Sequence, residues 1–261
     1  MEAYSLLDAM KRLLVTPLSP FNVLERASKE AESLLPVVAV VMLAIVLAVQ
    51  ASVLISPVRI KPCEGRMLPT LQVRSESGVI EIVLIEPVKT YPLRPPLDAV
   101  STAVLTLSLS LALAKWLSLA IGIYVSKRLW GPRGGASPFI LAGYALSTDV
   151  YSEAVRTALI AVSLSEVNRV VVVAPRGITY NLLESCVRAV VSSLEPLRTL
   201  TPLHAAFFAV WGLVVLFAVF SSGLGMDTKH SVLAAIVSAL VHIAVFNPAS
   251  LVLRAALRVV V

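Results

Sequence analysis

Residues 34–55 read LLPVVAVVMLAIVLAVQASVLI, an apolar run whose main polar interruption is Gln50. A helix needs about 20 predominantly apolar residues to cross the hydrocarbon core of a bilayer, and this run is long enough. It follows a charged segment and is too long for the apolar region of a cleaved signal peptide. The run therefore predicts a first membrane-spanning helix over residues 34–57.

The composition agrees with a membrane protein. Of 261 residues, 57% are apolar and 15% are charged, and the mean hydropathy is +0.87. A soluble domain of this length needs far more charge to cover its surface. The net charge of +6 raises nucleic acid as a partner, but Lys and Arg are spread over every loop and form no single basic stripe. Basic flanks of apolar helices more often mark orientation and lipid contact, so we expect the lipid bilayer as a partner and no nucleic acid.

Four further apolar blocks predict spans over residues 98–125, 137–164, 202–224 and 230–256. The block at 137–164 differs from the others because it contains charged residues. Ser147, Thr148 and Asp149 favour a helix N-cap over a helix interior, so this third span is predicted to be bent or broken near them. The predicted fold class is an all-α polytopic membrane protein with about five transmembrane helices.

Two polar inserts separate the spans. In residues 58–97, runs rich in β-branched residues flank Ser-Glu-Ser-Gly at 75–78 and predict a small β-hairpin after the first span. In residues 165–201, Val170–Val173 predicts a short strand, and helical spacing over Ile178–Leu197 predicts an amphipathic helix.

Residues 1–33 have amphipathic character. A first set of apolar residues recurs at helical spacing, and a second set follows two prolines. These sets are Ala3, Leu6, Leu7, Met10, Leu13 and Leu14, then Phe21, Leu24, Ala27, Ala31 and Leu34. Two short amphipathic helices before a first span are typical of an interfacial segment. The alternative is a helix packed under the loops of the bundle.

The short loop 126–136 indicates the orientation. It carries Lys127, Arg128 and Arg133 and no acid, and short cytoplasmic loops gather basic residues. With five spans, a cytoplasmic 126–136 loop also places the N terminus in the cytoplasm and both polar inserts outside. The expected localisation is the cell membrane, as a multi-pass protein.

Lys115 lies close to the middle of the second predicted span. A charge at that depth costs ~3 kcal/mol on insertion scales, so it normally faces the bundle interior and has a partner. Lys115 is 16 residues before Gly131 in the connecting loop, and Asp149 is 18 residues after it. At ~1.5 Å per residue, both reach a similar depth. Glu153 lies one turn further on, so the spacing predicts a Lys115–Asp149 or Lys115–Glu153 pair.

Arg156 lies three residues after Glu153 and predicts an i,i+3 ion pair on the same helix. The polar cluster of Lys115, Asp149, Glu153 and Arg156 has two interpretations. In the first, the cluster fixes the register of the helices, or Lys115 snorkels along its helix. In the second, it forms an ion or proton path through the bundle.

The cysteines and histidines of the chain limit which disulfides, metal sites and catalytic sites it can form. Cys63 and Cys186 lie in the two inserts predicted to be outside, where the compartment permits a disulfide; two unpaired thiols are the alternative. Two cysteines and three scattered histidines offer no metal-ligand spacing, so no metal or cofactor is expected. The chain contains no nucleophile elbow, His-Glu-x-x-His motif, Walker A motif or dinucleotide fingerprint, and its histidines have no obvious nucleophile to serve. We therefore expect a protein that is not an enzyme.

Three segments resemble the Yip1 family of membrane proteins. They are LLVTPLSPFNVL at 13–24, GGASPFILAGYAL at 134–146, and the two apolar runs joined by Ser-Ser-Gly-Leu in 202–245. The chain lacks the Tyr-Gly-Pro element of eukaryotic relatives and carries Ser147-Thr148-Asp149 where the family has a proline after Gly-Tyr. The long insert at 58–97 is another departure.

This resemblance implies a five-span protein with a cytosolic N terminus. Eukaryotic members bind Rab-type GTPases and act in vesicle traffic, but the missing elements leave a non-catalytic scaffold or adaptor as the expected function. Its protein partners are expected at the cytoplasmic segments 1–33 and 126–136. The alternative is a transporter, or a subunit of one, that uses the cluster around Lys115; the absence of an inverted repeat argues mildly against a stand-alone transporter.

Overall fold

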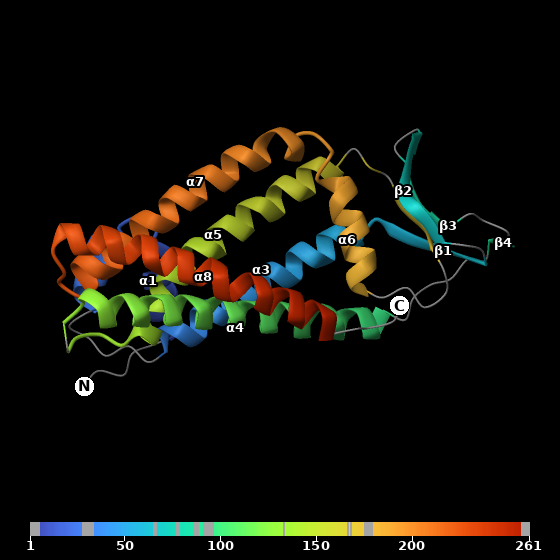
Figure 1. Cartoon of the computed structure of the whole chain (residues 1–261). Helices are drawn as coiled ribbons and strands as arrows, with labels where there is room; N and C mark the ends of the chain where they lie inside the picture. Colours follow the sequence, from blue (N-terminus) through green and yellow to red (C-terminus); the bar gives the residue numbers. More distant parts are fainter. Residues whose placement is uncertain are drawn as a thin grey trace. The chain divides into compact units, whose positions relative to one another are not determined.

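The computed structural model describes residues 6–27, 34–64, 67–76, 79–85, 89–90, 97–132, 134–165, 167, 169–174 and 180–256 (Figure 1). The chain divides into two compact units. The first comprises Met1–Val46, Ser108–Glu153 and His204–Leu253, and the second comprises Leu47–Leu107, Ala154–Leu203 and Arg254–Val261.

The described part of the chain is mostly helical, with strands confined to the second unit. The helices are α1 (Leu6–Val15), α2 (Pro20–Ala27), α3 (Leu35–Ile55), α4 (Leu97–Trp130), α5 (Pro138–Leu164), α6 (Tyr180–Val191), α7 (Leu197–Ala218), the π-helix η1 (Val219–Gly223) and α8 (Thr228–Ala256). The strands are β1 (Val58–Glu64), β2 (Met67–Glu76), β3 (Val79–Ile85), β4 (Lys89–Thr90) and β5 (Arg169–Ala174).

Four helical segments among the described residues are long and apolar enough to cross a membrane. They are α3, residues Val104–Trp130 of α4, α7 together with η1, and α8. These segments match four of the five spans expected from the sequence. The chain is therefore a multi-pass membrane protein by the length and composition of its helices.

The remaining predicted span forms α5, which is one uninterrupted helix of 27 residues (Figure 1). The predicted break near Ser147-Thr148-Asp149 is therefore wrong, whereas the alternative of a bend there stays a prediction. Ser147 donates its hydroxyl to the carbonyl of Tyr144 on the same helix at 2.6 Å, and Asp149 has a partner on α4. Because Ser147 and Asp149 find partners while they remain in the helix, neither acts as a cap.

Close backbone approaches hold the helices of the first unit together. A Cβ added to Gly122 on α4 would lie 2.6 Å from the carbonyl oxygen of Ser238 on α8. One turn along, the hydroxyl of Ser126 lies 3.0 Å from the carbonyl of Ala234 and 2.9 Å from the hydroxyl of Ser238. Small residues allow this approach, and the hydroxyls bind the second helix where it is closest.

The N-terminal helices α1 and α2 also belong to the first unit. Helix α2 packs against η1, at the end of α7, and the ring of Phe21 meets Phe217 edge-on at 6.0 Å between centroids. The hydroxyl of Tyr151 on α5 donates to the carbonyl of Leu14 at 2.7 Å, near the C-terminal end of α1. The described part of segment 1–33 is therefore docked on protein along one side.

The second unit contains a five-stranded sheet with the strand order β2-β3-β5-β1-β4. The central strand β5 pairs in parallel with β1 on one side and with β3 on the other. The edge strands β2 and β4 pair antiparallel with β3 and β1. Strand β5 comes from the insert after α5 and the other four come from the insert after α3, so the two inserts complete a single sheet.

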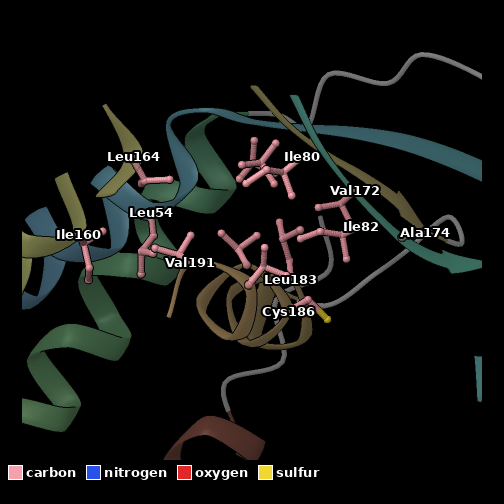
Figure 2. Close-up of a cluster of buried hydrophobic side chains, with 14 of the residues drawn as sticks. Leu54, Ile80, Ile82, Ile160, Leu164, Val172, Ala174, Leu183, Cys186 and Val191 are labelled. Carbon is pink, nitrogen blue, oxygen red and sulfur yellow. The ribbon is translucent and has the colours of Figure 1, made fainter. Parts of the chain in front are cut away.

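Helix α6 covers one face of this sheet (Figure 2). Alternate residues of β5 point to the two faces. Val170, Val172 and Ala174 join the buried cluster with α6, whereas Val171 and Val173 lie in a separate cluster with Val83. The first cluster also includes Leu54 from the end of α3 and Ile160 and Leu164 from the end of α5. One hydrophobic core thus joins the sheet, α6 and these two helix ends.

The structure confirms part of the predicted fold and corrects the rest. Strands β2 and β3 form the predicted hairpin and β5 the predicted short strand. The amphipathic helix after β5 is shorter than predicted, because α6 ends at Val191. An all-α fold is too simple a description, since strands from two distant inserts pair in one five-stranded sheet.

A polar cluster in the helical bundle as candidate functional site

Lys115 on α4 meets two carboxylates of α5 within the first unit. Its Nζ donates to Oδ1 of Asp149 at 2.7 Å and lies 3.5 Å from Oε1 of Glu153. The predicted pairing of Lys115 with these acids is therefore confirmed, and both acids take part. Asp149 and Glu153 contact the same ammonium because they are four residues apart, one turn along the helix.

The three charged side chains are largely enclosed. Their relative exposures are 14% for Lys115, 26% for Asp149 and 15% for Glu153. The Lys115 ammonium also lies 5.7 Å from the ring centroid of Phe246 on α8, a cation–π distance. The cluster therefore links α4, α5 and α8, and neutralises the lysine with side chains of the same unit.

A histidine and a serine extend this network toward α8. Nδ1 of His242 lies 2.7 Å from the hydroxyl of Ser118, and the His242 ring stacks on Phe246 at 5.6 Å. The Ser118 hydroxyl also donates to the carbonyl of Lys115 at 2.8 Å. Ser118 is 1% exposed, and its hydroxyl lies between α4 and α8. The serine–histidine pair therefore serves as a hydrogen bond between two helices.

A second histidine contact links α5 to α7. Nε2 of His204 lies 3.0 Å from the backbone carbonyl of Ser152 and 3.4 Å from its hydroxyl. Ser152 directly precedes Glu153, so this contact lies beside the carboxylates. The polar cluster thus reaches each of the helices α4, α5, α7 and α8 within the first unit.

Arg156 is the remaining member of the predicted cluster. It lies on α5 three residues after Glu153, in the part of the helix that belongs to the second unit. The predicted ion pair between Glu153 and Arg156 stays a prediction.

The second unit contains a polar cluster of its own. Glu184 on α6 is 3% exposed. Its carboxylate lies 2.6 Å from Nη2 of Arg188, one turn along α6, and 3.3 Å from Nη1 of Arg254 at the end of α8. Arg188 also donates to the side chain of Gln50 on α3 at 3.2 Å. We call these four residues the α6 latch, because they connect α6 to α3 and α8.

Cys186 lies on the face of α6 that packs against the sheet (Figure 2). It is a free thiol in the structure, so the disulfide with Cys63 is not formed there. Burial raises the pKa of the Cys186 thiol. Cys186 is a buried member of the hydrophobic cluster, at its edge in Figure 2, where it packs as a small apolar side chain. The side chain of Cys63 lies outside the described residues.

Sequence reasoning missed the partners that come from distant segments. Ser118 and His242 are 124 residues apart, and Gln50 and Arg188 are 138 residues apart. Gln50 was the main polar interruption of the first span, and that position was a usable signal. Glu184 and Arg188 have the i,i+4 spacing of a helical ion pair, which the polar insert also offered. Nothing local marks Ser118 as a partner of His242.

Comparison of the chain with protein-family models, with curated proteins and with solved structures found no match.

Proposed function

We propose that the chain is a non-enzymatic, five-span protein of the cell membrane that works as a scaffold or adaptor, as the similarity to the Yip1 family implies. One observation carries the proposal. The inserts after α3 and α5 fold into a single sheet backed by α6, in place of two unrelated loops. Strand β1 starts at Val58, directly after α3 ends at Ile55. A folded surface joined to the end of α3 by two residues suits the recognition of a partner at a membrane.

The path of the chain supports a crossing by α5. Helix α4 has 34 residues and a length of about 51 Å, more than the ~30 Å of a hydrocarbon core. If α4 crosses, the chain leaves it on the side opposite the sheet. Helix α5 then ends at Leu164, and β5 enters the same sheet at Arg169. A crossing by α5 would return the chain to the side of the sheet, which supports a fifth span.

The charged residues of α5 are compatible with a crossing because they are paired. Asp149 and Glu153 share the ammonium of Lys115, and paired charges that face the interior of a bundle are the form that membranes tolerate. The basic last turn of α4, with Lys127 and Arg128, favours a cytoplasmic loop after it. Five spans then leave the N terminus in the cytoplasm and the sheet outside.

Photo-crosslinking in native membranes tests the adaptor function. A photoreactive amino acid replaces exposed Val73 on β2, exposed Ala189 on α6 or exposed Gly134 in the α4–α5 loop. Leu240 on α8 serves as the control, because it is an exposed apolar residue on a spanning helix. We expect a discrete protein adduct from one of the first three positions and none from Leu240. If all positions yield only lipid adducts, the adaptor function is wrong.

The cluster around Lys115 favours a second candidate, a transporter or a transporter subunit. Three helices of the first unit carry titratable side chains of the kind that proton relays use. These side chains are Lys115, Asp149, Glu153 and His242. The purified protein in liposomes with a pH-sensitive dye inside provides the test. Proton flux that is lost in a folded Lys115→Met variant supports transport. The absence of flux from the wild-type protein removes this candidate.

A further inference from the structure

Helix α1 has three distinct faces. Ala9 and Leu13 are buried against the protein, at 0% and 1% exposure. Leu6, Met10 and Leu14 follow at i, i+4 and i+8 on the adjacent side and are exposed, together with Leu7. Asp8 and Lys11 are exposed on a third side. At 100° per residue, the apolar exposed sector lies between the buried sector and the polar sector.

The exposed apolar sector is too large for a helix that faces only water. Leu6 is 62% exposed and Leu7 is 74% exposed, and Leu18 in the turn before α2 is 73% exposed. Single exposed apolar residues are ordinary on a soluble surface, whereas a contiguous group marks a contact with another apolar phase. The buried residues Ala9 and Leu13 hold the helix on the protein, so the exposed leucines cannot turn inward.

Helix α2, which follows α1 after a short turn, docks at the end of a spanning segment. Helix α2 packs on η1, and η1 forms the last residues of the apolar segment Leu197–Gly223. The chain then turns at Gly225, which has φ of +66°, before α8 begins. The end of a spanning helix is where the hydrocarbon core gives way to the polar headgroups.

We propose that α1 and the turn after it lie along this boundary, with one face on the bundle, Leu6, Leu7, Met10, Leu14 and Leu18 among the acyl chains, and Asp8 and Lys11 in the headgroup layer. The occupant of the exposed apolar face is thus the lipid surface. A helix with a narrow apolar sector beside a charged sector binds in the plane of the interface. This placement combines the two sequence-based alternatives for residues 1–33, since the segment is both packed on the bundle and interfacial.

Spin labels at single cysteines test this placement with the whole chain. The background carries Cys63→Ser and Cys186→Ala, and the labelled positions are Leu7→Cys, Leu14→Cys, Asp8→Cys and Lys11→Cys. Ile45→Cys is the reference for acyl-chain exposure, because Ile45 is exposed on the spanning helix α3. Purified protein is placed in vesicles of phosphatidylcholine and phosphatidylglycerol. Collisions with oxygen report the apolar phase, and collisions with a water-soluble nickel chelate report the aqueous phase.

We expect a several-fold higher ratio of oxygen to nickel collisions at positions 7 and 14 than at positions 8 and 11, with Ile45→Cys higher still. Equal ratios at all four positions of α1, or nickel-dominated collisions at positions 7 and 14, overturn the proposal. Line shapes check that α1 stays helical and docked. Because the vesicles contain no partner protein, the outcome is independent of the adaptor function.

Discussion

At the scale of single residues, Lys115 shows how an ionised side chain is retained inside an apolar helix. Its ammonium contacts two carboxylates and faces an aromatic ring. The pair Lys115–Asp149 is matched in depth by chain length alone, since each residue lies a similar number of residues from the α4–α5 connection. Enclosed charges whose partners belong to the protein favour a role in holding helix register.

The substitution Lys115→Met should destabilise the protein. It leaves Asp149 without its cation in an enclosed site, and breaking one side of a buried pair costs ~3–5 kcal/mol. Thermal unfolding in detergent micelles measures the loss. Adding Asp149→Asn to Lys115→Met should recover part of it. Lys127→Met is the control, because the Lys127 ammonium bonds only to the Ala136 carbonyl in the described contacts, at the end of α4. A Lys115→Met protein as stable as the wild type contradicts the role of the pair.

The close packing at Gly122 leads to a second prediction at this scale, about stability. A methyl group there meets the Ser238 carbonyl oxygen at 2.6 Å, so α4 and α8 must separate in Gly122→Ala. Overpacking of this kind costs ~1–3 kcal/mol. Gly212→Ala is the matched control, since its added methyl meets nothing within 4 Å and alanine is the better helix former. Unfolding by denaturant should separate the two variants, and equal stability argues against close packing at Gly122.

At the scale of elements, the start of α8 depends on a titratable cap. Asp227 accepts a hydrogen bond from the backbone N–H of His230 at 3.1 Å and contacts the His230 ring. The hydrogen bond from the His230 side chain, followed by that from its backbone, holds the pKa of Asp227 below its usual value. A carboxyl with a lowered folded pKa stabilises the protein above its unfolded pKa, and this contribution disappears as the pH falls through the folded value.

We therefore expect the cap to weaken in acid. Asp227→Ala should lower the melting temperature at neutral pH, and the difference from the wild type should shrink below about pH 4, where aspartate protonates. Asp227→Asn is the informative control. Asparagine caps helices as well as aspartate does, but it does not titrate. An Asp227→Ala difference that is constant from neutral pH to pH 3 contradicts the role of this carboxylate.

The contribution of the α6 latch can be tested by measuring how fast Cys186 is labelled. Glu184→Gln removes the charge that Arg188 and Arg254 share, so α6 should separate from its partners more often. In a Cys63→Ser background, maleimide labelling of the buried Cys186 should accelerate by about tenfold, which corresponds to ~1.4 kcal/mol of opening free energy. Ala189→Ser, on the exposed side of α6, should leave the rate unchanged. An unchanged rate in Glu184→Gln means that the core alone holds α6.

At the scale of the whole molecule, the single sheet leads to a prediction about the membrane topology. Val73 lies on β2, after α3, and Ser192 lies just after α6. Both positions should react with an impermeant thiol reagent from the same side of the membrane when changed to cysteine in a cysteine-free chain. Gly134→Cys, between α4 and α5, should react only from the opposite side, which we expect to be the cytoplasm. If Ser192→Cys reacts together with Gly134→Cys, α5 does not cross.

Features that depend on local properties of the chain could be predicted from the sequence. Apolar length predicted the spanning segments, since the thickness of a bilayer sets the length of a helix that crosses it. Alternation and turn residues predicted the β2–β3 hairpin, whose partners are neighbours in the chain. The constant rise of a helix predicted the pairing of Lys115 with the acids of α5.

The tertiary structure alone decided the contacts between distant segments. The union of two inserts in one sheet, the bond between Ser118 and His242, and the α6 latch all join residues from separate parts of the chain. It also decided that Asp149 has a cation beside it within a continuous α5, because Lys115 comes from α4. The thickness of the bilayer sets the length of each spanning helix, and this can be recognised along the chain. The partners of these side chains depend instead on which helix faces meet in the folded protein.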